Sequence, residues 1–349
     1  MMQENDSILV FEYFTASGEK DKCIISEAEA LIFALLDDLK DYNIDLVINE
    51  SYKNAVGNFK NVNPILIDCD VVDWLSDNAA NFTKAIFISA ENNNNLFCIT
   101  KILEDSNVEV YNSSSSASHI ASDKFESYKK LENIVPQPLS FKMEIDHNGD
   151  WKKTIKDVYK KRNSSKLIIK PLIGVDCEDI VVIDELRFDL DKIFKPGTLV
   201  LVQEFIEGTD ISVSLISDGK KAVPISLNKQ FILLENDRGN YLGGKLPFNA
   251  EFRDDAYEIA VKAVESVDGL RGFVGVDLII SDEGEIYLLE INSRFTTPYV
   301  GLKKIADINI GKTIIEVIDK KLDINELNIS LDGEVEFKKS GDNLDIRRV

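Results

Sequence analysis

Two apolar stretches on either side of the turn sequence SDEG constrain the fold of this 349-residue chain more than any other feature. Residues 272–294 read GFVGVDLIISDEGEIYLLEINSR, with the turn at 281–284. Apolar runs of this length around turn residues are typical of an antiparallel β-hairpin. We therefore predict paired strands over 272–280 and 285–291.

Three polar side chains interrupt this apolar hairpin. Successive side chains of a strand point to opposite faces, so Asp277 lies on the face opposite to that of Val276 and Leu278. Glu290 and Asn292 are two residues apart and share one face. With a tight turn at 282–284, Asp277 falls within one residue of the position across from Glu290. Oxygen atoms of Asp277, Glu290 and Asn292 are therefore expected to converge.

Two neighbouring carboxylates buried in an apolar hairpin repel each other unless a cation lies between them. Carboxylate and amide oxygens are ligands that Mg²⁺ prefers, and sparse Mg²⁺ sites complete their shell with substrate phosphates and water. Arg294 faces the same side as Asn292 and is suited to hold a carboxylate or a phosphoryl group. The alternative is that these acids lie on the solvated face of an edge hairpin, with Arg294 in a surface salt bridge.

The first part of the chain alternates between strand and helix patterns. Short apolar runs predict strands over 7–11, 45–49, 64–68 and 84–89. A helix is predicted over 26–39, where Ser26 is a candidate N-cap and Leu31, Leu35, Leu36 and Leu39 form an apolar stripe. Such alternation indicates parallel strands in a wound α/β layer. Because the layer contains no GxGxxG sequence, a dinucleotide site there has no support.

The remainder of the chain has a different organisation. The serine-rich sequence NSSSSAS at 112–118 predicts a linker, and a helix is expected over 122–131. Beyond residue 166 strand patterns follow one another more often, which indicates an α+β architecture. These strands are predicted over 166–170, 180–183, 199–205, 211–217 and 222–226, with helices over 254–267 and 311–320 and a charged tail.

Four segments in order resemble the ATP-grasp superfamily of carboxylate–amine ligases. The hairpin resembles the metal-binding strands of that family, which implies that Asp277, Glu290 and Asn292 bind Mg²⁺ or Mn²⁺. SDK at 122–124 and IIKP at 168–171 resemble two nucleotide-binding elements. QEFIEG at 203–208 resembles the hinge that contacts adenine through its backbone. The resemblance implies that ATP is bound by Lys124, Lys170, Gln203, Glu204, Phe205, Ile206 and Glu207, the last through the ribose.

The resemblance implies an ATP-grasp fold of mixed α/β and α+β class. We expect a Rossmann-like pre-ATP-grasp domain over 1–112, a linker helix and lid subdomain over 113–205, and a C-terminal subdomain with the metal site over 206–349. One segment departs from the family pattern. The loop after the IIKP strand, LIGVDCED at 172–179, has Gly174 as its only glycine, whereas family members often carry a Gly/Ser-rich loop over the phosphates. Ser293 also stands where the family often has proline.

A narrower resemblance covers nearly the whole chain. ILVFEYFTASG at 8–18, NSSSSASHIASDK at 112–124 and EINSRFTTPYVGL at 290–302 resemble the archaeal-type tyramine–L-glutamate ligases of methanofuran biosynthesis. The resemblance implies that ATP phosphorylates the γ-carboxyl of L-glutamate and that tyramine attacks the acyl phosphate, which Arg294 would hold. Glu12, Tyr13 and Tyr241 are candidates for contacts with the substrates.

Three alternatives remain at this point: another ATP-grasp amino-acid or peptide ligase, a nucleotide-binding module without turnover, and an acidic interaction protein. Composition restricts the partners further. The net charge of −21 disfavours nucleic acid, and no apolar run approaches the ~18 residues of a membrane span. The N-terminus carries acids where a signal peptide carries basic residues, so we expect a cytoplasmic protein.

Overall fold

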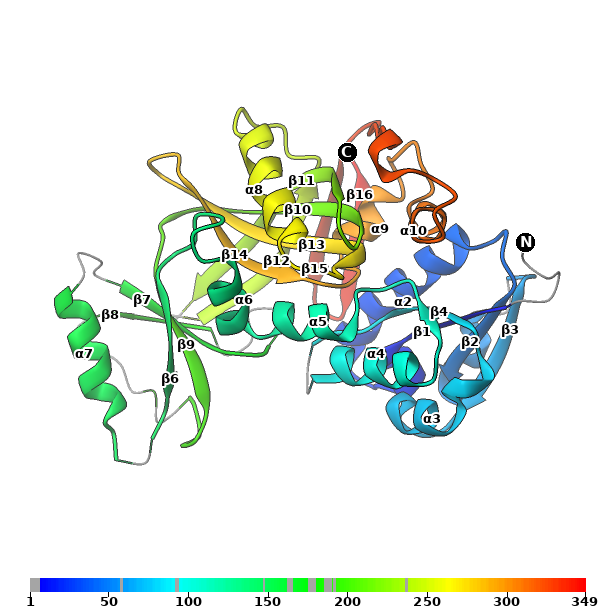
Figure 1. Cartoon of the computed structure of the whole chain (residues 1–349), viewed down its shortest axis with the longest axis horizontal. Helices are drawn as coiled ribbons and strands as arrows, with labels where there is room; N and C mark the ends of the chain where they lie inside the picture. Colours follow the sequence, from blue (N-terminus) through cyan, green and yellow to red (C-terminus); the bar gives the residue numbers. More distant parts are fainter. Residues whose placement is uncertain are drawn as a thin grey trace.

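Three parts follow one another along the longest axis of the computed structural model (Figure 1). A parallel sheet near the N-terminus lies at one end, a long antiparallel sheet forms the body, and β6 to β9 with α7 form the other end. The structure describes residues 7–56, 59–91, 94–146, 148–161, 166–174, 180–184, 190, 193–235 and 238–349.

The N-terminal sheet has the order β3-β2-β1-β4-β5, and all its neighbouring strands are parallel, as predicted. Its strands are β1 (Ile8–Glu12), β2 (Ile44–Asn49), β3 (Val62–Ile67), β4 (Lys84–Ile88) and β5 (Glu109–Val110). The helices beside it are α1 (Tyr13–Ser17), α2 (Lys22–Asp38), α3 (Val71–Asn78) and α4 (Asn95–Asp105), with 3₁₀ turns at Glu50–Val56 and Ala79–Asn81.

Helix α2 begins four residues earlier than the sequence predicted. Asp21 is its N-cap, because the Asp21 carboxylate accepts a hydrogen bond from the Cys23 N–H at 2.9 Å. Ser26 instead accepts a hydrogen bond from the Leu344 N–H at 2.9 Å. The predicted leucine stripe is confirmed, since all four of its members are buried in one core cluster.

The linker predicted over 112–118 is wrong in its second half, because α5 (Ser115–Ser122) begins there. The Ser114 hydroxyl accepts a hydrogen bond from the Ala117 N–H at 3.2 Å, and the Glu104 carboxylate accepts one from the Ser115 N–H at 3.0 Å. Serine is common in linkers but is also a preferred N-cap, and here Ser114 caps a helix. Helix α6 (Lys124–Leu131) follows at once, with Asp123 as its N-cap.

The antiparallel sheet runs in the order β14-β13-β10-β11-β12-β8-β7-β9-β6. Its strands are β6 (Ser140–Glu144), β7 (Lys166–Pro171), β8 (Val181–Asp184), β9 (Leu199–Glu204), β10 (Gly208–Asp218), β11 (Ala222–Glu235), β12 (Arg238–Leu246), β13 (Arg271–Ser281) and β14 (Ile286–Asn292). Helix α7 (Trp151–Lys161) packs on β6 to β9 through Trp151. Strand β11 is longer than predicted, and β12 was not predicted.

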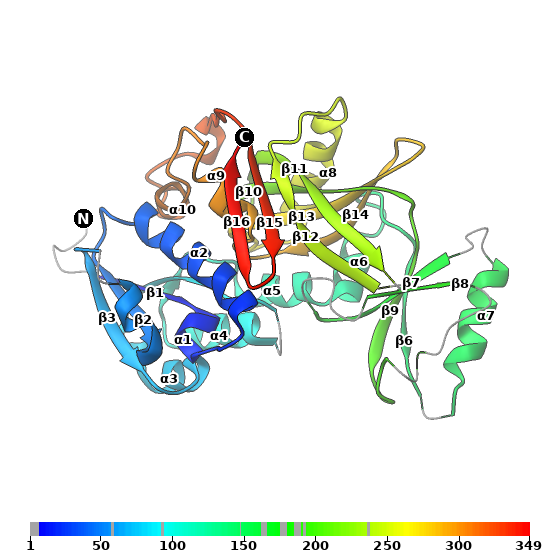
Figure 2. The same cartoon turned by 180° about the vertical axis from the view of Figure 1, so that it is seen from behind.

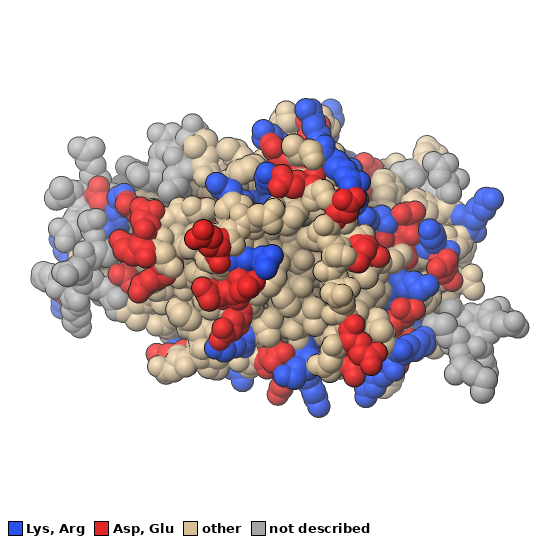
Figure 3. All heavy atoms as spheres, turned by 90° about the horizontal axis from the view of Figure 1, so that it is seen from above, with Lys and Arg blue, Asp and Glu red and all other residues tan. Residues whose placement is uncertain are grey.

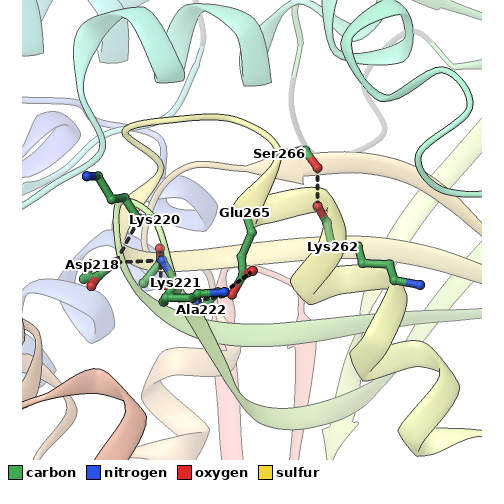
Figure 4. Close-up of polar contacts among 8 residues, drawn as sticks. Asp218, Lys220, Lys221, Ala222, Lys262, Glu265 and Ser266 are labelled. Atoms are coloured by element: carbon green, nitrogen blue, oxygen red, sulfur yellow. Dashed lines mark hydrogen bonds and ion pairs between the residues drawn. The ribbon is translucent and has the colours of Figure 1, made fainter.

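Helix α8 (Arg253–Glu265) is joined to the turn between β10 and β11 (Figure 4). The Glu265 carboxylate accepts a hydrogen bond from the Ala222 N–H at 3.2 Å and pairs with the Lys221 ammonium at 3.1 Å. Asp218 closes the turn by accepting hydrogen bonds from the N–H groups of Lys220 and Lys221 at 2.8 and 2.7 Å. These contacts hold α8 against the face of β10 and β11 that is packed in the core.

The charged C-terminal tail, for which no element was predicted, forms the hairpin β15 (Val335–Ser340) and β16 (Asn343–Arg348). Strand β15 pairs with β12, and β16 packs against α2 of the N-terminal part (Figure 2). The alternating residues Val335 and Phe337 are buried, which gives this charged segment an apolar face. Helices α9 (Pro298–Leu302) and α10 (Ile310–Ile318) and a 3₁₀ turn at Ile324–Glu326 precede the hairpin.

Among the described residues, no helix combines the length and the apolarity that crossing a bilayer requires. On the face seen in Figure 3, acidic and basic side chains lie interspersed among uncharged residues.

Candidate functional site

A cavity of about 400 Å³ opens where β7, β8 and β9 meet the rest of the antiparallel sheet. All but one of the residues predicted to bind the nucleotide, the metal or the acyl phosphate line it: Lys124, Lys170, Gln203, Glu204, Phe205, Ile206, Asp277, Glu290, Asn292 and Arg294. Glu207 is not among the lining residues. The chain therefore brings side chains from α6, β7, β9, β13 and β14 around one space.

The predicted hairpin and its register are confirmed. β13 and β14 are antiparallel, and Asp277 lies directly across from Glu290. Asp277 lines the cavity, whereas Val276 and Leu278 point into the core on the other face of β13. The alternation of apolar and polar residues thus delivers the two carboxylates and the Asn292 amide to the cavity face.

Asp277 accepts hydrogen bonds from two amide groups. Its Oδ1 accepts from the Gln230 Nε2 at 2.9 Å, and its Oδ2 accepts from the Asn292 Nδ2 at 2.8 Å. Burial, together with the negative charge of Glu290, raises the pKa of Asp277 to about 7. Gln230 was missed by sequence reasoning, since β11 was predicted to end before it.

Glu290 has the opposite electrostatic environment. Burial alone would raise its pKa, but the positive charges of Lys124 and Lys170 outweigh burial and hold the pKa of Glu290 below its ordinary value. The Lys124 ammonium lies 3.2 Å from the Glu290 carboxylate. The two facing acids are therefore unequal: Glu290 is compensated by lysines, whereas Asp277 is not.

The donor set fits a hard divalent cation. Asp277 and Glu290 supply carboxylate oxygens from paired strands, and Asn292 supplies an amide oxygen. A cation between them would remove the repulsion that raises the pKa of Asp277. The described residues contain no cluster of three or more His, Cys, Asp or Glu able to hold a metal alone. Such a sparse set suits Mg²⁺ or Mn²⁺ that is also bound by phosphate oxygens.

Two buried lysines flank these acids. Lys124 is the first residue of α6; its N–H donates to the Leu172 carbonyl at 3.0 Å and its Nζ donates to the Gly174 carbonyl at 2.9 Å. Lys170 lies on β7 and is 5% exposed. Buried ammonium groups favour anionic ligands. The glycine-poor loop predicted to cover the phosphates continues through 175–179, which lies outside the described residues.

The end of β9 and the residues after it form the hinge side of the cavity. The Gln203 Nε2 donates to the Ser140 hydroxyl at 2.9 Å, while its Oε1 is buried with no hydrogen-bond partner in the described part of the chain. A buried acceptor of this kind calls for a donor from a ligand. Ile168, Val182, Ile279 and Leu289 add apolar side chains to the cavity lining.

Glu207 lies apart from the cavity lining. Its side chain is 65% exposed and pairs with the Lys166 ammonium at 2.8 Å. Asp210, three residues on, does line the cavity, and burial raises its pKa to about 6. Sequence reasoning missed Asp210, although the alternation Gly208, Asp210, Ser212 along β10 places all three on the cavity face.

Arg294 lines the cavity and is held by the N-terminal part of the chain. Its Nε donates to a carboxylate oxygen of Glu91 at 2.7 Å, and both side chains are largely buried. Glu91 follows β4 and was not predicted. Sequence reasoning had no signal for it, because nothing in the segment after β4 links it to residue 294.

Of the three residues predicted to contact the substrates, one lines the cavity and two do not. Glu12 and Tyr13 are not among the cavity-lining residues. Glu12 caps α1 through the N–H groups of Phe14 and Thr15, and burial raises its pKa to about 7. Tyr241 does line the cavity, from strand β12 rather than from a turn.

Comparisons with known proteins identify the family and the fold. A family profile described as an ATP-grasp domain matches residues 121–298, about half of the chain. Tyramine–L-glutamate ligases from Methanocaldococcus fervens and Methanocaldococcus jannaschii are 32% and 33% identical to it, over 94% of this chain and 98% and 92% of theirs. The crystal structure of an ATP-grasp superfamily protein from Archaeoglobus fulgidus superposes with a TM-score of 0.72 at 25% identity, over 99% of this chain and all of that one. The chain belongs to the ATP-grasp family.

Proposed function

We propose that this protein is an ATP-dependent ligase that joins the γ-carboxyl of L-glutamate to the amine of tyramine, as in methanofuran biosynthesis. The observation that carries the proposal is the facing pair Asp277 and Glu290, buried in a cavity that Lys124 and Lys170 also line. The similarity to tyramine–L-glutamate ligases over nearly the full length of both chains supports the choice of substrates.

The adenine ring of ATP would lie against the backbone of 203–206 and the apolar side chains of the cavity lining, with the Gln203 Oε1 accepting from its amine. We assign the ribose to Asp210 rather than to Glu207, because Asp210 lines the cavity and Glu207 pairs with Lys166 outside it. Lys124 and Lys170 would neutralise the phosphates. Mg²⁺ or Mn²⁺ bound by Asp277, Glu290 and Asn292 would supply charge neutralisation at the β- and γ-phosphates.

The reaction has two steps. An oxygen of the substrate γ-carboxylate attacks the γ-phosphorus, the bond to the bridging oxygen of ADP breaks, and an acyl phosphate forms. The amine nitrogen then attacks the acyl carbon, inorganic phosphate leaves and the nitrogen loses a proton. Arg294 would hold the acyl phosphate with charge-assisted hydrogen bonds, oriented by Glu91. Burial of the site would limit hydrolysis of the acyl phosphate.

The test is ADP release by the purified protein with Mg²⁺-ATP, over a panel of carboxylates and amines. We expect release that requires both L-glutamate and tyramine, with a product of the mass of γ-glutamyltyramine. A different required pair would assign the protein to another ATP-grasp amino-acid or peptide ligase. Binding of ATP with no release for any pair would indicate a module without turnover.

A further inference from the structure

The cavity continues beyond the paired acids, away from the hinge. The pairing of β10 with β13 gives its axis: Asp210 lies across from Ile279 near the hinge, Ser212 across from Asp277, and Ser214 across from Gly275. Each step of two residues advances roughly 7 Å along a strand. The lining then passes to Thr296, Thr297 and, from helix α2 of the N-terminal part, Glu27. The cavity lining therefore extends at least one such step beyond Asp277.

The surroundings of Gly275 show where Thr296 lies relative to β13 and β14. A Cβ at Gly275 would meet the Thr296 Cγ2 at 3.3 Å and the Asn292 Cβ at 3.5 Å. Thr296 thus packs beside the metal-binding strands, and its neighbour Thr297 donates a hydrogen bond from its hydroxyl to the Glu27 carboxylate. Glu27 is thus a lining carboxylate that is joined through Thr297 to the segment after β14.

The walls around Glu27 are held in place by the C-terminal hairpin. The Lys339 ammonium on β15 lies 3.1 Å from the second Glu27 oxygen and 5.5 Å from the centroid of the Tyr241 ring. The hydrogen bond between Ser26 and Leu344 joins the same helix to β16. Two elements that sequence reasoning missed, β12 and the C-terminal hairpin, therefore position a carboxylate and an aromatic ring at this end.

At this end the cavity lining presents the carboxylate of Glu27. Glu27 is paired with Lys339, and Glu91 is paired with Arg294. The charge of Glu27 also acts on the buried Glu12 carboxylate, for which no ion pair is found in the described part of the chain. Glu12 lies outside the cavity lining and burial raises its pKa to about 7, so Glu27 is the acid placed to accept a charge-assisted hydrogen bond from a cationic ligand.

We propose that Glu27 binds the α-ammonium group of the amino-acid substrate, with Tyr241 as the wall beside it. The proposal rests on the proposed function, in which the reacting carboxylate attacks the γ-phosphate near the metal ligand Asp277. In an extended glutamate, four bonds of about 1.5 Å separate the α-nitrogen from the γ-carboxyl carbon, a span of about 5 Å. That span and an ammonium–carboxylate contact of about 3 Å give a reach of about 8 Å from the γ-carboxyl carbon to the binding carboxylate. The other possible occupant is the amine acceptor, and a rise in KM confined to tyramine would reveal it.

The test compares L-glutamate with glutarate, which differs by lacking the α-ammonium group. KM is measured for each acid with saturating ATP, Mg²⁺ and tyramine, for wild type, for Glu27→Gln and for the matched control Glu29→Gln on the same helix, which does not line the cavity. We expect Glu27→Gln to raise the KM for L-glutamate at least tenfold, as for loss of a charge-assisted hydrogen bond. The KM for glutarate and for tyramine should stay within twofold of wild type. Gln retains an acceptor oxygen for Thr297, so the wall should keep its position.

Three results would overturn the assignment: equal rises in the KM for L-glutamate and for glutarate, which indicate a displaced wall; a rise in KM confined to tyramine; or no change relative to Glu29→Gln.

Failure of the proposed function gives a different result. If wild type uses L-aspartate in place of L-glutamate, the proposed donor is refuted, and the same comparison is made with L-aspartate and succinate. If wild type turns over no acid, calorimetric binding of L-glutamate and glutarate to the protein with Mg²⁺ and a non-hydrolysable ATP analogue replaces KM. Equal affinity of wild type for the two acids would then overturn the assignment.

Discussion

Replacing Asp277 with asparagine separates the cost of burying this carboxylate from its use as a metal ligand. In the folded protein, burial and the charge of Glu290 raise the pKa of Asp277 from 3.8 to about 7. The unfolded chain ionises at the lower value, so the charged side chain destabilises the fold increasingly as the pH rises from about 4 to 7. This rise in the pKa of Asp277 corresponds to a loss of unfolding free energy of at most about 4 kcal/mol.

We therefore expect metal-free Asp277→Asn to be more stable than wild type at pH 8, by up to about 4 kcal/mol, with the gain lost near pH 4. Gln230 and Asn292 can adapt by turning an amide oxygen toward the new amide nitrogen. The same variant should lose Mg²⁺-dependent ADP release. Urea denaturation in EDTA at pH 8 and pH 4, together with a coupled ADP assay, measures both effects.

Glu290→Gln is the matched comparison, and it should change stability in the opposite direction. It removes the carboxylate that lies 3.2 Å from the Lys124 ammonium and leaves two buried lysines without their counter-charge. Breaking a buried pair of this kind costs about 3 kcal/mol. If both variants change the metal-free stability with the same sign at pH 8, the unequal environments assigned to the two acids are refuted.

The remaining predictions concern the nucleotide, Arg294 and one helix cap. Burial raises the pKa of Asp210 to about 6, so Asp210→Asn should stabilise the metal-free protein at pH 8 by up to about 3 kcal/mol, with no gain near pH 4 in urea denaturation. The same variant should raise the KM for ATP, whereas Glu207→Gln should not; the reverse result would return the ribose to Glu207. Glu91→Gln should lower kcat about tenfold with an unchanged KM for ATP, because it loosens Arg294; an unchanged kcat would remove Glu91 from the site. Ser114→Ala should destabilise the protein by about 1 kcal/mol through loss of the cap of α5, and equal urea midpoints would contradict the cap.

The hairpin could be predicted from the sequence because local rules determine it. The turn SDEG and the period-two alternation fix both the pairing and the face of each side chain, so these two patterns suffice to place Asp277 across from Glu290. The parallel N-terminal sheet could also be predicted locally, from strand patterns that alternate with helix patterns. The division of the chain at residues 112 and 205 stays a prediction, and the antiparallel sheet runs continuously across the second boundary.

The parts that could not be predicted depend on contacts between distant segments. Glu91 reaches Arg294 across 203 positions of sequence, and Lys339 on β15 reaches Glu27 on α2. The hairpin that carries Lys339 has a charged sequence and gains its stability by pairing with β12. Local patterns carry no information on such partners, because the tertiary fold alone creates them. Asp210 is the exception, since the alternation along β10 was available in the sequence.

The central claim is that Asp277, Glu290 and Asn292 bind a divalent cation together with the phosphates of ATP. Electron paramagnetic resonance of Mn²⁺, titrated with protein in the presence and absence of a non-hydrolysable ATP analogue, tests this claim directly. We predict that wild-type protein binds Mn²⁺ more tightly when the analogue is present and that Asp277→Asn abolishes this enhancement while remaining folded. Mn²⁺ binding that is the same in Asp277→Asn as in wild type would contradict the account.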